Sequence, residues 1–206
     1  MTKTLLLCWG LIFSSCLGIH AQFTEQDDYL VLNTNDTIYG RVSYINEKAI
    51  NRGFHKKIRS TDAQGKTKKY KRERLKAFRV NGMVYHGFWL SQPPQSFPPI
   101  SLVNPRYNID FNDGKYYFLK VISNGNLSHY ELEWFDQGDS QLWSLSLLKK
   151  VHNDYFIRAD QGIMGLKKKV LQRYFTDCGK LQEKIKNSEI KEVWQVVEAY
   201  DNNCNR

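Results

Sequence analysis

The segment FRVNGMVY, residues 78–85, carries the clearest signal of local structure in the chain. Its central dipeptide, Asn81-Gly82, most readily adopts the two positive φ angles of a two-residue hairpin turn. Pairing outward from this turn sets two apolar pairs opposite each other: Val80 with Met83 and Phe78 with Tyr85. The segment therefore predicts an antiparallel hairpin that buries one face.

An earlier segment, DYLVLNTNDTIYGRVSYI at 28–45, has two alternating runs around a polar turn at 33–36. Alternation with a period of two is typical of a half-buried strand, so this segment predicts a second hairpin. Gly40 lies inside the second run. A glycine in mid-strand indicates a bulge or the close approach of another backbone.

A third hairpin is predicted around Asn124-Gly125. Its simplest register places Val121, Leu119 and Tyr117 opposite Ser128, Tyr130 and Leu132, with Lys120 opposite His129. Weaker strand patterns follow at 142–148 and 154–159. Together these runs predict an antiparallel, β-rich unit, either a sandwich or a roll.

All five prolines lie between Pro93 and Pro105. Proline cannot donate to a strand ladder, so we expect an extended connection across the surface here. A peptide-docking segment is the less favoured alternative.

After Gly165 the apolar period becomes helical. The repeats are Leu166, Val170 and Tyr174, then Leu181 and Ile185, then Ile190, Val193, Trp194 and Val197. We expect Ser188 to cap the N-terminus of the last helix, with Glu189 in its first turn. Cys178 and Cys204 flank the last two helices. In an oxidising compartment such a pair favours a disulfide, which antiparallel helices would permit.

This order of elements resembles uncharacterised secreted proteins of Bacteroidota. The similarity rests on a D-T-I-x-G-x-V/I hairpin, here DTIYGRV at 36–42, and on a C-terminal helical segment that ends in YDNNC at 200–204. The resemblance implies export into a Gram-negative envelope and a β-rich unit followed by helices. It implies no activity.

The first 21 residues have the layout of a secretory signal peptide, with Lys3 before an apolar run from Leu5 to Phe13. That run is too short to span a bilayer, which takes roughly 20 apolar residues, and no other segment approaches this length. Cleavage after Ala21 is favoured and leaves a periplasmic or secreted protein. The alternative is lipidation of Cys16 and an outer-membrane lipoprotein, although Phe13 replaces the usual Leu of the lipobox.

Positive charge is concentrated in one segment. The chain has a formal net charge of +9, and residues 52–79 contain 12 Lys or Arg against Asp62 and Glu73. We select as contacts for an anionic surface Lys66, Lys68, Lys69, Lys71, Arg72 and Arg74. An anionic envelope component, another protein or the membrane periphery is the expected partner, because export argues against nucleic acid. The alternative is a pair of solvated strands joined by the turn at 62–65.

Enzyme signatures are sparse. The chain has no G-x-S-x-G turn, no H-E-x-x-H and no glycine-rich phosphate loop. His86, His129 and His152 are scattered, and the Asn108–Gly114 segment departs from a calcium loop because its glycine comes one place late. Trp89, Trp134, Trp143 and Tyr107 suit a core better than a sugar-binding face. We therefore assign no catalytic residue, cofactor or metal ligand.

The sequence thus predicts an α+β protein with a signal peptide at 1–21, a β-rich domain at 22–160 and a helical appendage at 161–206. A non-enzymatic binding module with a basic surface segment is the favoured function. The alternative is an envelope hydrolase whose site is assembled from scattered residues.

Overall fold

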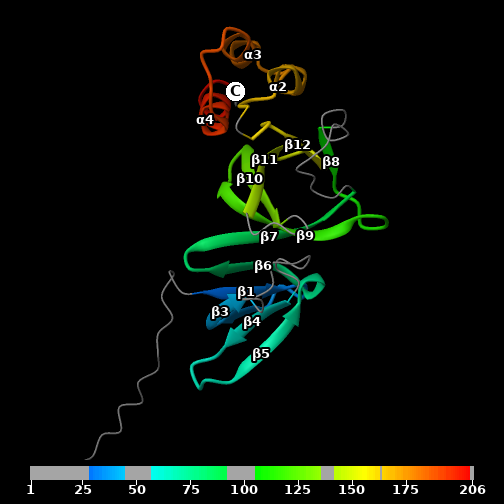
Figure 1. Cartoon of the computed structure of the whole chain (residues 1–206), viewed down its shortest axis with the longest axis vertical. Helices are drawn as coiled ribbons and strands as arrows, with labels where there is room; N and C mark the ends of the chain where they lie inside the picture. Colours follow the sequence, from blue (N-terminus) through cyan, green and yellow to red (C-terminus); the bar gives the residue numbers. More distant parts are fainter. Residues whose placement is uncertain (1–27, 45–56, 92–104, 136–141, 163, 205–206) are drawn as a thin grey trace, which may run out of the picture.

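The computed structural model describes residues 28–44, 57–91, 105–135, 142–162 and 164–204. Within these ranges the chain forms two antiparallel sheets followed by helices, as the α+β prediction required (Figure 1). The larger sheet has nine strands in the order β2-β1-β6-β7-β9-β10-β11-β12-β8, and the smaller has the order β3-β4-β5. The predicted leader, Cys16 and Pro93–Pro99 lie outside the described residues.

The hairpin around Asn81-Gly82 is confirmed. Strands β6 (Leu75–Val80) and β7 (Met83–Leu90) pair in the predicted register, and the turn residues have φ angles of 49° and 78°. The rings of Phe78 and Tyr85 stack with centroids 4.7 Å apart. Both rings are buried, so this hairpin supplies the core beneath the smaller sheet.

The first predicted hairpin is also present, as β1 (Tyr29–Leu32) and β2 (Thr37–Tyr39). Beyond Gly40 the chain enters β3 (Arg41–Tyr44) of the smaller sheet, which pairs with β4 (Lys57–Thr61), and β4 pairs with β5 (Thr67–Lys71). Gly40 has φ +151°, and a Cβ there would lie 2.5 Å from the Thr61 carbonyl oxygen. The predicted close approach of another backbone is therefore confirmed at the point where the chain changes sheets.

The predicted register of the third hairpin is wrong by two residues. In β9 (Lys115–Ser123) and β10 (Leu127–Phe135), Val121 lies opposite Tyr130 and Lys120 opposite Glu131. The cause is a longer reversal than the two-residue turn, because Ser123 pairs with His129 instead of Asn126, an offset of three residues. The bulge at Ile122 then reduces the offset to two. A shift of two residues keeps every side chain on its face, so the predicted core face survives.

The remaining strands close a roll. β11 (Leu142–Lys150) and β12 (Tyr155–Arg158) confirm the two weaker patterns, and β12 pairs with the short β8 (Arg106–Asn108). An isolated bridge between Leu90 and Ile109 then joins the end of β7 to the β8 segment. The six strands β7 to β12 form this roll. Each contributes side chains to its interior, including Leu90, Tyr107, Leu119, Leu132, Leu145 and Phe156.

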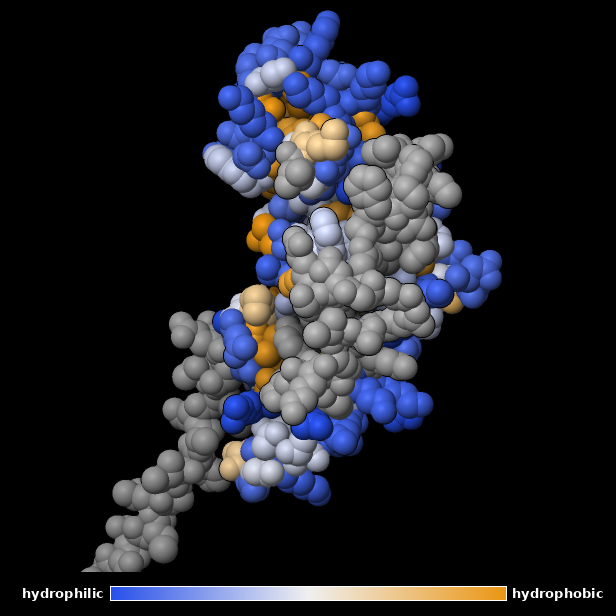
Figure 2. All heavy atoms as spheres, viewed as in Figure 1, coloured by the Kyte–Doolittle hydropathy of each residue, from blue (hydrophilic) through white to orange (hydrophobic). Residues whose placement is uncertain are grey.

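Three helices, α2 (Lys168–Tyr174), α3 (Gly179–Lys186) and α4 (Val193–Asn203), follow the roll. Their apolar sides pack with Leu127, Leu148 and Ile157 on the outside of the roll. Figure 2 shows hydrophobic atoms between this helical unit and the strands, under a hydrophilic outer surface. No helix in the described part of the chain is long and apolar enough to cross a membrane.

Two details of the helical prediction are wrong. Ser188 does not cap α4; it has φ +62° just after α3, and its N–H donates to the Ile185 carbonyl. The chain needs residues 188–192 to reverse direction, so α4 starts at Val193, and Glu192 and Gln195 form its capping box. Trp194 is 57% exposed, because Val193, Val196 and Val197 form the packed stripe instead.

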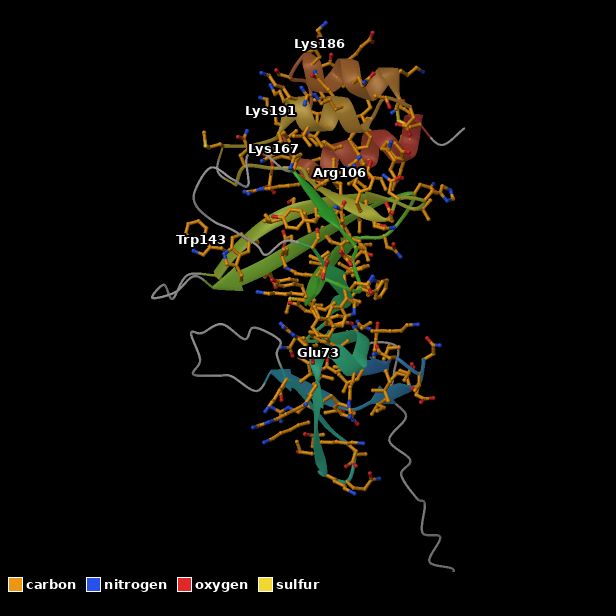
Figure 3. All side chains as sticks on the ribbon, turned by 90° about the vertical axis from the view of Figure 1, so that its right-hand side faces the viewer. Glu73, Arg106, Trp143, Lys167, Lys186 and Lys191 are labelled. Atoms are coloured by element: carbon orange, nitrogen blue, oxygen red, sulfur yellow. A yellow bond between two sulfur atoms is a disulfide. The ribbon has the colours of Figure 1, made fainter. Side chains whose placement is uncertain are left out.

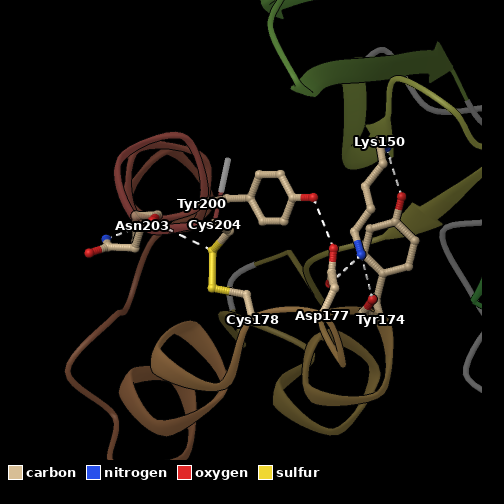
Figure 4. The surroundings of a disulfide bond; sticks show 8 residues. Lys150, Tyr174, Asp177, Cys178, Tyr200, Asn203 and Cys204 are labelled. Atoms are coloured by element: carbon tan, nitrogen blue, oxygen red, sulfur yellow. Dashed lines mark hydrogen bonds and ion pairs between the residues drawn. A yellow bond between two sulfur atoms is a disulfide. The ribbon is translucent and has the colours of Figure 1, made fainter. Parts of the chain in front are cut away.

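The predicted cysteine pair is confirmed: Cys178 and Cys204 are disulfide-bonded, with Cα atoms 5.5 Å apart (Figure 4). The bond joins the start of α3 to the end of α4. It closes the helical unit on the end farthest from the α3–α4 connection, as antiparallel helices require.

Candidate anion-binding surface

The smaller sheet has two chemically different faces. Val42, Ile58 and Tyr70 lie on one face and are buried against the larger sheet. The opposite face carries cationic side chains from all three strands, which we call the cation face: Arg41, Lys57, Arg59, Lys69 and Lys71. All are exposed except Arg59, which is half-buried. Figure 3 shows nitrogen-tipped side chains extending from this sheet, below the labelled Glu73.

Like charges lie directly opposite each other on this face. The register sets Lys57 opposite Lys71 and Arg59 opposite Lys69. Opposed residues in an antiparallel pair have Cβ atoms about 4.5–5.5 Å apart, and like charges at that distance destabilise the sheet. The sequences of β3, β4 and β5 contain no Asp or Glu to offset this repulsion. The buried Arg59 Nε also has no hydrogen-bond partner among the described residues.

The six predicted contact residues do not form one patch. Lys69 and Lys71 belong to the cation face, whereas Lys66 follows the 62–65 turn. Lys68 lies on the other side of β5, with its Nζ 5.2 Å from the centroid of the Tyr70 ring. Arg72 and Arg74 lie in a short 3-10 helix, η1 (Arg72–Arg74), and Arg72 pairs with Glu73 at 3.0 Å.

Three members of the cation face were not selected from the sequence: Arg41, Lys57 and Arg59. Lys57 and Arg59 were only partly accessible to prediction, because counting outward from the 62–65 turn pairs them with Tyr70 and Lys68. The observed partners, Lys71 and Lys69, follow because the Asp62 N–H donates to the Lys66 carbonyl, which adds one residue to the reversal. Arg41 was not, because no local pattern indicates that β3 leaves its hairpin partner for the smaller sheet.

A cavity of about 480 Å³, which we call the edge pocket, lies beside β5. Leu32 and Tyr70 are its apolar lining. The other lining residues are polar or cationic: Asn33, Thr34, Lys68, Lys69, Lys71 and Arg74. Asn33 holds the β1–β2 turn in place: its Nδ2 donates to the Glu73 carbonyl at 2.7 Å and its N–H to the Arg74 carbonyl at 3.1 Å. Lys68 and Arg74, which lie off the cation face, thus meet at this pocket.

The histidines and carboxylates that a hydrolase would need lie apart from this surface. His86 Nδ1 contacts the Tyr130 hydroxyl at 3.3 Å. His129 is only 6% exposed, and neither of its ring nitrogens has a hydrogen-bond partner in the part of the chain that the structure describes. Burial lowers the pKa of both imidazoles. Burial also raises the pKa of Glu133, although Lys120 lies 3.7 Å from its carboxylate. No hydrogen bond between a histidine and a carboxylate occurs among the described residues.

Other candidate features have structural roles. Trp134 and Tyr107 are buried inside the roll, and Trp89 packs edge-on against Tyr116. Asp110 Oδ1 accepts the N–H groups of Asn112 and Asp113, so the calcium-like segment is a polar turn. Within the described ranges no group of His, Cys, Asp or Glu side chains is arranged to hold a metal ion.

Comparison with known proteins finds no matching family model, curated protein or solved structure.

Proposed function

We propose that this protein is an exported, non-enzymatic binding module that contacts an anionic component of the cell envelope through the cation face. The observation that carries the proposal is the opposition of like charges, Lys57 with Lys71 and Arg59 with Lys69, on strands without an acidic residue. This arrangement costs folding stability. Phosphate or carboxylate groups laid over the face offset that cost.

Electrostatic attraction toward a charged surface supports the same class of partner. Each Lys or Arg near an anionic lipid surface contributes about 1 kcal/mol of attraction. Mobile ions screen it beyond about 10 Å at 0.1 M salt. Binding through the cation face is therefore salt-sensitive, which separates it from binding by burial of apolar area.

The predicted leader and the disulfide between Cys178 and Cys204 support an envelope location, because disulfides persist in oxidising compartments. Lipid headgroups and lipopolysaccharide phosphates are anionic groups of that compartment. In the lipoprotein alternative, the lipid on Cys16 anchors the protein, and the cation face adds an electrostatic contact with the same membrane.

Co-sedimentation of the mature protein with phosphatidylglycerol vesicles tests this function. We expect the wild type to bind at 50 mM salt, to release at 500 mM, and not to bind phosphatidylcholine. The variant Lys57→Gln/Lys69→Gln/Lys71→Gln should lose affinity by about 100-fold, at roughly 1 kcal/mol per charge. The control Lys180→Gln/Lys184→Gln/Lys186→Gln removes the same charge from exposed positions of α3 and should bind normally. If the two variants lose the same vesicle affinity, binding depends on net charge and not on the cation face.

A further inference from the structure

The edge pocket differs from the cation face because it combines an apolar lining with positive charge. Tyr70 is 8% exposed and Leu32 packs against the same core, so this lining is continuous with the folded interior. Lys68, Lys71 and Arg74 surround it. Its volume, about 480 Å³, lies within the range of about 300–1,000 Å³ that is typical of small-molecule sites.

The walls of the pocket are fixed by bonds between segments far apart in sequence. Besides the two hydrogen bonds of Asn33, Lys76 Nζ donates to Asn35 Oδ1 at 2.5 Å, which ties the far side of the β1–β2 turn to β6. The Tyr116 hydroxyl donates to the Leu75 carbonyl and secures the chain after η1. The pocket is therefore formed before a ligand arrives, and binding does not have to order its walls.

The nearby carboxylates already have partners. Glu73 accepts from Arg72 at 3.0 Å, and Asp36 accepts from the Thr34 hydroxyl at 2.6 Å. The residues that line the cavity thus include four cations, Lys68, Lys69, Lys71 and Arg74, and no acidic side chain.

We propose that the edge pocket binds one lipid phosphate, with the start of its acyl region against Leu32 and Tyr70 and its phosphate among Lys68, Lys71 and Arg74. This inference rests on the proposed function and deepens it. Lys69 and Lys71 border the pocket and also belong to the cation face. A membrane drawn to that face therefore brings its headgroups directly to the pocket, where one lipid is held by apolar contact as well as by charge.

Calorimetric titration with dodecyl phosphate below its micelle concentration tests this inference. We expect it to bind at least 10-fold more tightly than glycerol phosphate, which lacks the chain, and than dodecyl maltoside, which lacks the charge. If glycerol phosphate binds as tightly as dodecyl phosphate, the pocket is a site for free phosphate and the proposal is wrong.

Thr34→Trp is the decisive variant. Thr34 is exposed at the pocket, and an indole there fills the cavity without changing the net charge. Thr34→Val is its matched control, because it also removes the hydroxyl bonded to Asp36 but leaves the cavity open. We expect Thr34→Trp to cause at least a 10-fold loss of dodecyl phosphate binding, whereas salt-sensitive vesicle binding through the cation face should persist. The pair Lys68→Glu/Arg74→Glu should also lose dodecyl phosphate, whereas the control Lys66→Glu/Lys180→Glu should retain it. Retention by Thr34→Trp overturns the pocket. Vesicle binding without dodecyl phosphate binding refutes the pocket alone, whereas absence of vesicle binding refutes the proposed function.

Discussion

Lys150 Nζ lies 2.6 Å from Asp177 Oδ1 and joins the last residue of β11 to the segment between α2 and α3 (Figure 4). The same ammonium group donates to the Tyr174 carbonyl at 2.9 Å and stands over the rings of Tyr174, Phe175 and Tyr200. The Tyr200 hydroxyl donates to the other oxygen of Asp177 at 3.0 Å. This lysine is thus one polar link between the roll and its helical unit, beside the bond from Asn153 Nδ2 to the Tyr174 hydroxyl at 3.0 Å.

Replacing Lys150 by Met should lower the free energy of unfolding by about 1–3 kcal/mol, because hydrogen bonds to a partly buried charge are lost together with its ring contacts. Urea unfolding followed by circular dichroism measures this change. Lys180→Met, at an exposed position of α3, is the control and should change stability by less than about 0.5 kcal/mol. Equal effects of the two substitutions would show that the link contributes nothing.

Stability should fall as the pH is lowered from 7 to 5. Burial lowers the pKa of His129 below its ordinary value of 6.5, although Glu131 and Asp160 oppose this shift. The unfolded chain therefore binds a proton at a pH where the folded chain does not, and protons favour unfolding. His86 shifts in the same direction because it is also buried. Asp177 affects stability only at lower pH. Burial alone would raise the pKa of its carboxyl group, but the bonds from Lys150 and Tyr200 bring this pKa below its ordinary value of 3.8.

Thermal melting between pH 5 and 7 tests the contribution of His129. His129→Leu should flatten the pH dependence, whereas His152→Leu, at an exposed position, should preserve it. If His129→Leu leaves the pH dependence of the melting temperature unchanged, groups other than His129 cause it.

Gly40→Ala should destabilise the protein by about 1–3 kcal/mol, because the new Cβ meets the Thr61 carbonyl oxygen at 2.5 Å and φ is +151°. Gly179→Ala is the matched control, since nothing lies within 4 Å of a Cβ there and alanine favours a helix. Denaturant midpoints compare the two variants. A Gly40→Ala midpoint equal to that of wild type contradicts a tight junction between the sheets.

Removing the disulfide by Cys178→Ser/Cys204→Ser should cost roughly 3–4 kcal/mol, because the bond closes a loop with a sequence separation of 26. The melting temperature of the mature wild type should fall to that of the double variant in dithiothreitol. The variant itself should not respond to dithiothreitol, which provides the control for effects of the reductant.

Much of the fold is readable from local pattern. The Asn81-Gly82 turn determines both the position and the register of its hairpin, since a two-residue loop leaves no alternative pairing. The helical repeats likewise place Leu181 and Ile185 on a buried face. At Asn124-Gly125 the same dipeptide does not fix the register, because Ser123 pairs with His129 across a longer reversal. After the Ile122 bulge the offset is two residues, which leaves the same faces buried, so alternation alone cannot detect it.

For the candidate site, too, some features follow from the sequence and others only from the tertiary structure. The concentration of Lys and Arg at 52–79 is a property of the sequence, but its register is not. Counting from the 62–65 turn pairs Lys57 with Tyr70, whereas the bond from the Asp62 N–H to the Lys66 carbonyl sets Lys57 beside Lys71 and Arg59 beside Lys69. Only the tertiary structure decided that Arg41 joins them, because the change of sheet at Gly40 depends on a contact with Thr61, 21 residues away. Only the tertiary structure brought the β1–β2 turn to β5 and made the edge pocket, because the bonds of Asn33 to residues 73 and 74 leave no trace in the local pattern.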